Sequence, residues 1–268
     1  MNISFCLVVY NEEKNIRRCL ESIKDVAEEI LIVHDGACHD RTLDIAREYT
    51  DHVFVRGRLG GSDPHRIFLL ERAAYDWAFM IDADEFLSAE LQIFLKTADE
   101  KADCGAFAFL WPVWDGEKYV TTHNYRPVLF RKKQCWAVGL HNFSTQTIGP
   151  VCKKPFRLEH RPKNPRISGT LFPSYLYARV DRDANMFVKD FDALETYNAA
   201  LIPNSFKHWF KQQQDRAGLY LFWRPIKYFL GTYKNVYKDG RVGFVLAVRA
   251  AAYRFLLSRR IWQLKRKK

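Results

Sequence analysis

The chain has 268 residues, 48% of them hydrophobic and 15% aromatic, so it can bury a large core and is not a disordered protein. Its six cysteines are scattered without a C-x-x-C pair, which predicts reduced thiols and argues against a disulfide framework or a zinc site. The net charge of +11 is uneven, because residues 204–268 carry 16 Lys or Arg and 2 Asp or Glu while the rest is nearly neutral.

Apolar runs alternate with amphipathic segments from the first residues onward, so no signal peptide is expected. Strands are predicted at 3–10, 29–33, 52–55 and 77–81, and helices at 11–25, 40–49 and 65–75. This alternation predicts a mostly parallel sheet with helices on both faces. Less regular strands are expected at 106–111, 119–120, 128–131, 135–138 and 156–160, followed by a helical pattern at 175–200.

Polar turns follow three of the predicted parallel strands, and they contain Asn11-Glu12, Asp35-Gly36 and the acidic run 82–85. The carboxyl ends of parallel strands meet at one rim of an open sheet, where ligands bind. Convergence of these turns therefore predicts a binding site. The turn after the first strand contains no glycine, which excludes the glycine-rich fingerprint of dinucleotide-binding folds.

Asp82 and Asp84 lie two positions apart, so in an extended backbone both carboxylates point to the same face. Such an oxygen-only pair suits Mg²⁺ or Mn²⁺, with a phosphate completing the coordination shell. The alternative is an acidic helix start, for which Glu85 is a plausible residue. Asp35 before a glycine also has an ordinary alternative as a turn residue.

The first 90 residues resemble the donor-binding half of a family 2 glycosyltransferase of GT-A fold, in the branch of the lipopolysaccharide core beta-glucosyltransferases. The matching segments are VVYNEEKNI at 8–16, CLESI at 19–23, EILIVHDGACHDRT at 29–42, HRIFLLERAAYDW at 65–77 and IDADEF at 81–86. Weaker matches are RPVLFRK at 126–132, VGLHN at 138–142, LEH at 158–160 and KDGRVGF at 238–244. The resemblance implies a Rossmann-like, mostly parallel sheet flanked by helices.

The resemblance also implies roles for individual residues. Asp35 would bind the base of a nucleotide-sugar, most often uridine, and Arg66 would lie near the diphosphate. Asp84 would be the direct ligand of Mg²⁺ or Mn²⁺, Asp82 its partner, and His160 a further metal or diphosphate contact. The nucleoside pocket would be lined by Val9, Tyr10, Asn11 and Glu12.

The general base is the open point. Where relatives carry a His-Glu pair this chain has His141-Asn142, and asparagine accepts no proton at neutral pH. The candidates for the base are His141, Asp115 and Glu117. One alternative is a nucleotide-sugar-binding protein that has lost catalysis, and another is a nucleotidyltransferase with a similar sheet.

Residues 204–268 interleave cations with aromatic side chains. Arg249 and Arg254 interrupt the last apolar run, and each arginine at a bilayer centre costs roughly 2.5–3.5 kcal/mol, so helices lying in a membrane interface are expected instead of a span. The alternative is a packed helical subdomain with solvated lysines. Nucleic-acid binding lacks any supporting motif.

The combined prediction is a GT-A domain at 1–203, with a nucleotide-sugar half at 1–95 and an acceptor half at 96–203, followed by a helical, basic and aromatic membrane-associating extension at 204–268. The predicted activity is metal-assisted, inverting transfer of a hexose from a UDP-sugar to a glycolipid or lipopolysaccharide-type acceptor. The predicted location is cytoplasmic, peripheral to the inner membrane.

Overall fold

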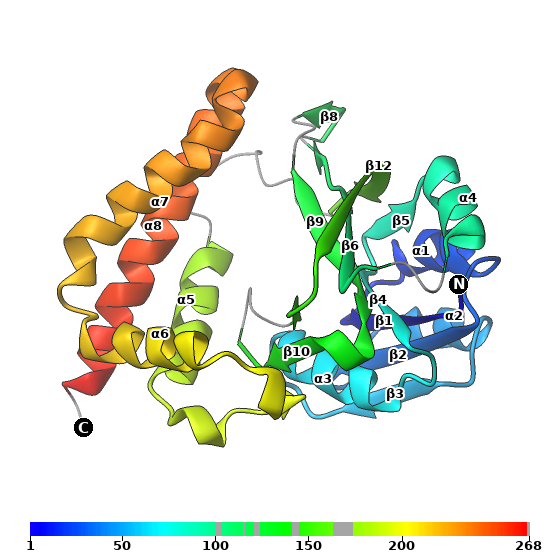
Figure 1. Ribbon diagram of the computed structural model, residues 1–268, viewed down its shortest axis with the longest axis horizontal. Coiled ribbons are helices and arrows are strands. Elements are labelled where there is room, and N and C mark those ends of the chain that lie inside the picture. The colour runs from blue at the N-terminus through cyan, green and yellow to red at the C-terminus, as the bar shows by residue number, and fades with distance from the viewer. Residues whose placement is uncertain (100–102, 115, 121–123, 141–144, 163–173, 267–268) are drawn as a thin grey trace. The chain divides into compact units, whose positions relative to one another are not determined.

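The computed structural model describes residues 1–99, 103–114, 116–120, 124–140, 145–162 and 174–266 (Figure 1). The chain divides into two compact units. The first unit consists of Met1–Val113, Thr122–Lys163 and Glu195–Leu201, and the second of Trp114–Thr121, Asn164–Leu194 and Ile202–Lys268. Each unit is described by itself.

The first unit begins with the predicted alternation of strands and helices. The strands β1 (Ile3–Val9), β2 (Glu29–Asp35), β3 (Val53–Arg56) and β4 (Trp77–Asp82) pair in parallel in the order β3-β2-β1-β4. They are connected by α1 (Ile16–Ile23), α2 (Thr42–Arg47) and α3 (Asp63–Arg72). The strands read as continuous apolar runs because a parallel sheet is covered on both faces.

The same sheet extends beyond β4 through β9 (Tyr125–Arg131), β6 (Ala106–Leu110), β12 (Val151–His160) and β5 (Glu85–Leu87). β9 runs antiparallel to both of its neighbours, and β5 runs antiparallel to β12. The result is a mixed, mostly parallel eight-stranded sheet, which confirms the predicted α/β class.

One alternative interpretation of the acidic run is wrong. Glu85 does not start a helix, because it begins β5 and pairs with His160. The helix α4 (Ala89–Thr97) starts only after Ser88, whose Oγ accepts a hydrogen bond from the Leu91 N–H at 3.3 Å. Ser88 is therefore the N-cap that satisfies one of the free amides of this helix.

Helices cover both faces of the sheet, and a separate apolar cluster lies on each face. On the face of α1 and α4, the rings of Phe5 and Phe79 stack at 4.8 Å, and Phe109 continues the stack at 6.0 Å from Phe79. On the face of α3, the buried Leu69 and Leu70 pack against the other side of the strands. This core fixes the strand ends that carry the site.

Shorter elements complete the described residues. They are the strands β7 (Val113–Trp114), β8 (Tyr119–Val120), β10 (Cys135–Val138), β11 (Gln146–Thr147) and β13 (Thr196–Tyr197) and the 3-10 turns η1 (Lys132–Gln134), η2 (Phe191–Ala193), η3 (Ala199–Leu201) and η4 (Tyr237–Asp239). β10 pairs with β11 on one side and β13 on the other.

The prediction that all six cysteines are reduced thiols is wrong for two of them. Cys104 and Cys152 form a disulfide with their Cα atoms 6.0 Å apart, and four cysteines are free. The parallel pairing of β6 with β12 sets Cys152 beside Phe107, which brings the two cysteines together although 48 positions separate them. Cysteine spacing alone does not reveal such a pairing.

The second unit is helical. It contains α5 (Ser174–Phe187), α6 (Asn204–Asp215), α7 (Tyr220–Val236) and α8 (Gly240–Lys265), with α7 and α8 lying side by side (Figure 1). The Tyr253 hydroxyl of α8 donates to the buried Asp183 carboxylate of α5 at 2.5 Å. The predicted C-terminal helical extension is thus confirmed. Within the described residues, no helix combines the length and apolarity that crossing a membrane requires.

Candidate functional site

The predicted rim exists at the carboxyl ends of the parallel strands. β1 pairs with β2 so that Val9 lies opposite His34, and with β4 so that Val8 lies opposite Asp82. The turn after β1 and the acidic residues Asp35 and Asp82 therefore emerge at the same edge of the sheet. The sequence argument predicted this juxtaposition.

The turn after β1 differs from the prediction of a helix that begins at residue 11. Asn11 has φ 50°, a left-handed conformation that asparagine tolerates well, and α1 begins only at Ile16. The Asn11 N–H donates to His34 Nε2 at 3.3 Å, and Asn11 Oδ1 accepts from the His39 N–H at 3.0 Å. Asn11 thereby fastens the turn after β1 to the turn after β2.

The remaining members of this turn have distinct environments. Val9 is buried, whereas Tyr10 is 40% exposed. The Glu12 N–H donates to Thr42 Oγ1 at 2.6 Å, and the Glu12 carboxylate accepts from Asn15 Nδ2 at 2.9 Å. The predicted nucleoside-pocket residues thus form one connected turn.

The Asp35 carboxylate is saturated with hydrogen bonds. Oδ1 accepts from the Leu59 N–H at 2.6 Å and lies 2.9 Å from His65 Nε2, while Oδ2 accepts from the Gly60 N–H at 3.0 Å and the Arg58 guanidinium at 3.1 Å. Two partners on each oxygen use all four lone-pair sites. Burial alone raises the pKa of Asp35, but the hydrogen bonds from Leu59 and His65 outweigh it and lower the pKa.

Two side chains contact the Asp35 carboxylate. The Arg58 side chain is about half exposed, whereas the His65 side chain is fully buried. The Arg58 guanidinium lies 3.3 Å from the centre of the Tyr10 ring and also donates to the Asp35 carbonyl at 3.1 Å. A planar, donating group therefore stacks on Tyr10 and hydrogen-bonds Asp35. A planar base with an N–H donor would need the same two contacts.

Asp82 accepts from two arginines. Arg66 on α3 donates to Oδ1 at 2.5 Å, and Arg126 on β9 donates to Oδ2 at 3.1 Å. Burial on its own raises the pKa of Asp82, but these two cations lower it far below its ordinary value. Asp82 is thus a permanent anion held between arginines.

Glu85 is fully buried and lies next to Asp82 and Arg126. Its carboxylate accepts from Trp111 Nε1 at 2.6 Å, from the Asp82 N–H at 3.0 Å and from the Arg126 guanidinium. Burial raises the pKa of Glu85, with Arg126 opposing the shift. Arg126 and Trp111 were absent from the predicted site; the family-like segment RPVLFRK at 126–132 was the available signal for Arg126.

Asp84 points toward the residue that the resemblance paired with it. Its Oδ2 lies 3.4 Å from His160 Nε2, and the His160 ring stacks on Trp111 with 4.4 Å between ring centres. One carboxylate oxygen and one imidazole nitrogen are donors that Mn²⁺ accepts. Across the described ranges, three His, Cys, Asp or Glu do not gather into a metal cluster, so water or phosphate oxygens would supply the other ligands.

The described residues do not test the three predicted candidates for the general base. Glu117 is exposed and belongs to the second unit. Asp115 and His141, together with Asn142, lie outside the described residues. Their role stays a prediction.

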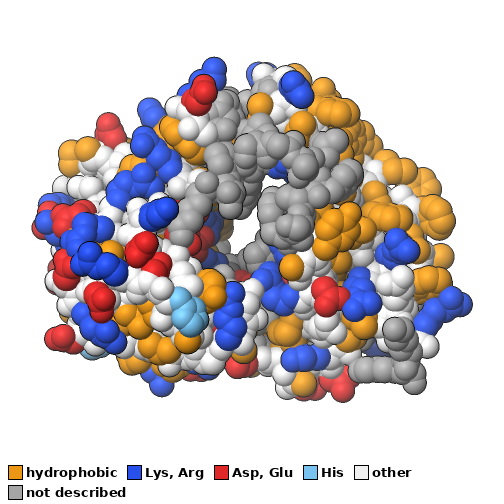
Figure 2. Space-filling model, turned by 180° about the vertical axis from the view of Figure 1, so that it is seen from behind, with side chains coloured by type: hydrophobic (Ala, Val, Ile, Leu, Met, Phe, Trp, Pro, Cys, Tyr) orange, Lys and Arg blue, Asp and Glu red, His pale blue; other side chains and the backbone are white. Residues whose placement is uncertain are grey.

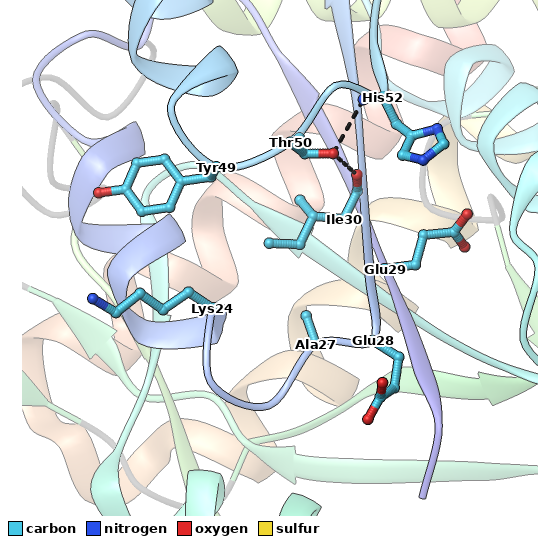
Figure 3. Close-up of a pocket in the computed structure, with 8 residues that line it drawn as sticks. All are labelled: Lys24, Ala27, Glu28, Glu29, Ile30, Tyr49, Thr50 and His52. Atoms are coloured by element: carbon cyan, nitrogen blue, oxygen red, sulfur yellow. Dashed lines mark hydrogen bonds between the residues drawn. The ribbon is translucent and has the colours of Figure 1, made fainter.

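A pocket of about 220 Å³ lies at the opposite, amino-terminal end of β2 (Figure 3). Thr50 Oγ1 donates to the Ile30 carbonyl at 2.8 Å and accepts from the His52 N–H at 3.1 Å. Glu29 is already bonded to Ser4 Oγ at 2.6 Å. The polar groups named here serve the fold, and the predicted site residues do not line this pocket.

Comparison with known proteins places the chain in a family. Residues 4–156 match the model of glycosyl transferase family 2. An uncharacterized glycosyltransferase of Rickettsia typhi is 37% identical over 90 residues, which are 34% of this chain and 30% of that protein. The SPbeta prophage-derived glycosyltransferase SunS of Bacillus subtilis is 35% identical over 86 residues, 31% of this chain and 20% of SunS. The matches thus span less than a third of these curated relatives.

Solved structures align over the whole chain at low identity. The crystal structure of S. aureus TarS 1–349 in complex with UDP-GlcNAc aligns with 100% of this chain and 92% of that one, at 16% identity and a TM-score of 0.47. The mixed sheet with its C-terminal helices is of the GT-A type, as predicted. Because the family model covers more than half of the chain, the protein belongs to glycosyl transferase family 2.

Proposed function

We propose that the protein transfers a hexose from a UDP-sugar to an acceptor hydroxyl with inversion at the anomeric carbon. The observation that carries the proposal is that two different environments lie at the same rim of the sheet. Tyr10 and Asp35 offer an aromatic face and a carboxylate for the base, while Asp82, Asp84 and Arg66 offer a charged end for a diphosphate. Family membership supports this assignment.

The charged end supplies the chemistry of the leaving group. Asp84 and His160 would hold Mg²⁺ or Mn²⁺, which neutralises the charge that develops on the departing nucleoside diphosphate. Arg66 adds a cation at the same rim, where it fixes the Asp82 carboxylate. In this proposal the acceptor proton goes to His141, Asp115 or Glu117.

We further propose that the acceptor is a glycolipid or lipopolysaccharide-type molecule at the cytoplasmic face of the inner membrane. The support is the composition of residues 204–268, in which cations and aromatic side chains alternate with almost no acid. The surface responsible is argued in the next subsection.

Thermal shift with a panel of nucleotide-sugars and Mn²⁺ tests the donor. A donor present at 100 times its Kd should stabilise the protein by about 2.7 kcal/mol. Release of UDP with a lipid acceptor then tests transfer, and Asp84→Asn should abolish it. Asp51→Asn, at an exposed acid away from the rim, is the matched control.

Two other results would favour the alternative functions. UDP-sugar binding without transfer to any acceptor would favour the catalytically impaired binding protein. Pyrophosphate release from a nucleoside triphosphate would favour the nucleotidyltransferase and overturn the proposal.

A further inference from the structure

The helix α7 exposes its apolar side. Apart from the adjacent Phe222 and Trp223, its exposed large side chains follow one another three or four positions apart, which places them on a single face of the helix. The most exposed are Phe222 and Trp223, each at 76%, and Leu230 at 60%. We name this surface the α7 outer face; it consists of Leu219, Phe222, Trp223, Ile226, Leu230, Tyr233 and Tyr237.

The less exposed side of α7 includes an arginine, although Phe222 and Trp223 are exposed on the outer face. Arg224 and Tyr228 are both less exposed than their neighbours on the outer face. Burial lowers the pKa of the Arg224 guanidinium, which lies 3.9 Å from the centre of the Tyr220 ring. A helix that only packed in water would place its phenylalanine and tryptophan inside and its arginine outside.

Cations border the outer face, and acids are nearly absent. Lys227, Lys234 and Lys238 are exposed along the same helix and the turn after it. Residues 216–268 contain 14 Lys or Arg and one acidic residue, Asp239. Figure 2 shows apolar side chains gathered along the part of the surface that α7 and α8 form, with basic side chains among them.

We propose that the α7 outer face lies in the interface of an anionic lipid bilayer, with the helix parallel to the membrane. The face extends for about 25 Å at 1.5 Å per residue, long enough for seven side chains to enter the headgroup boundary together. Trp and Tyr belong to the residues that favour this boundary, and the flanking lysines meet the anionic headgroups.

Charge selects this occupant over a second copy of the chain. Two copies joined through α7 would bring two strongly basic helical units together, which is unfavourable at moderate salt. An anionic bilayer neutralises the same charge. The proposal refines the predicted extension at 204–268 by assigning the contact to one face of α7, and it does not depend on the transfer reaction.

Vesicle flotation of the full chain tests the surface. Wild type should bind vesicles of phosphatidylcholine with about one third phosphatidylglycerol, and bind pure phosphatidylcholine far more weakly. The triple variant Phe222→Ser, Trp223→Ser, Leu230→Ser should lose at least roughly tenfold in affinity. The matched control Val55→Ser, Ile93→Ser removes apolar side chains that are 54% and 63% exposed elsewhere, and should bind like wild type.

A second set of variants tests the charge. Lys227→Gln, Lys234→Gln, Lys238→Gln should weaken binding to the anionic vesicles by roughly a hundredfold and leave binding to neutral vesicles unchanged. All changes are at exposed positions, so unaltered thermal unfolding confirms that the variants fold.

Two results would overturn the proposal. One is equal vesicle binding by wild type and the triple Ser variant. The other is a wild-type dimer that becomes monomeric in the triple variant while neither protein binds vesicles, which would make a second copy the partner.

Discussion

The guanidinium of Arg126 on β9 donates to the fully buried carboxylate of Glu85 on β5. The other terminal nitrogen of Arg126 reaches Asp82 at 3.1 Å, so one cation holds two acids at the rim. Two neighbouring carboxylates in a buried place repel each other unless a cation lies between them. Arg126 supplies that cation from the protein itself.

Removing Arg126 should therefore destabilise the first unit strongly. Arg126→Met leaves the Glu85 charge buried without its cation, for which we expect a loss of about 3–5 kcal/mol in the free energy of unfolding. Urea unfolding followed by tryptophan fluorescence measures it. Arg47→Met breaks an exposed pair with Asp44 and should cost about 0–1 kcal/mol.

The double variant Arg126→Met, Glu85→Gln separates charge from packing. It removes both charges, so it should be clearly more stable than Arg126→Met alone. Equal stabilities of the two variants would show that the Arg126 stem, and not its charge, holds the rim.

Arg58 should compete with the donor. Its guanidinium occupies both contacts that a base would use, the Tyr10 ring and the Asp35 carboxylate. Arg58→Ala should lower the Kd for UDP several-fold, about fivefold if displacing the cation–π contact costs about 1 kcal/mol. Calorimetric titration measures the Kd, with Arg47→Ala as control; weaker binding by Arg58→Ala would mean that Arg58 holds the nucleotide instead.

Asp35 should make the stability of the first unit depend on pH in acid. Because its pKa is lowered in the folded state, Asp35 contributes stability that is present above its ordinary pKa and is lost as the pH falls below about 4. Asp35→Asn should lower the free energy of unfolding by about 1–3 kcal/mol at pH 7. The Leu59 and Gly60 N–H groups donate to different oxygens of Asp35, and in asparagine one of these acceptors is replaced by an NH₂ donor. Chemical unfolding at pH 7 and pH 3 should show the difference between the proteins shrinking in acid; a constant difference would contradict this.

Much of this architecture was predictable because its signals are local. The apolar runs around Phe5 and Phe79 and the polar turns after them specify parallel strands whose ends meet, and that alone brings Asp35 and Asp82 to one rim. The family-like motif added His160, which indeed lies beside Asp84.

What the sequence did not reveal depends on contacts between distant segments. Arg126 reaches the rim only because β9 inserts beside β4, and Arg58 reaches Asp35 only because its loop folds back over the turn after β2. The disulfide likewise arises from the pairing of β6 with β12. Neither periodicity nor residue spacing encodes such long-range neighbours.

Reducing the disulfide should destabilise the first unit. The bond closes a loop of 48 residues between Cys104 and Cys152, and its removal should cost about 2–4 kcal/mol. Unfolding of the Cys104→Ser, Cys152→Ser variant measures this against Cys38→Ser, which removes a free and partly exposed thiol. A reductant should destabilise wild type and leave the double variant unchanged; equal sensitivity of both would show that other thiols respond.

His160 should set the affinity for the metal. Its Nε2 lies 3.4 Å from the Asp84 carboxylate, and its ring is fixed by stacking on Trp111, so the pair is oriented before a cation arrives. His160→Ala should raise the Mn²⁺ concentration needed for half-maximal UDP binding by about tenfold to a hundredfold. Titration of Mn²⁺ at fixed UDP measures this shift, and His52→Ala at the opposite end of the sheet should leave it unchanged. If His160→Ala kept the wild-type Mn²⁺ dependence, Asp84 would bind the cation without the imidazole, and His160 would serve only to pack against Trp111.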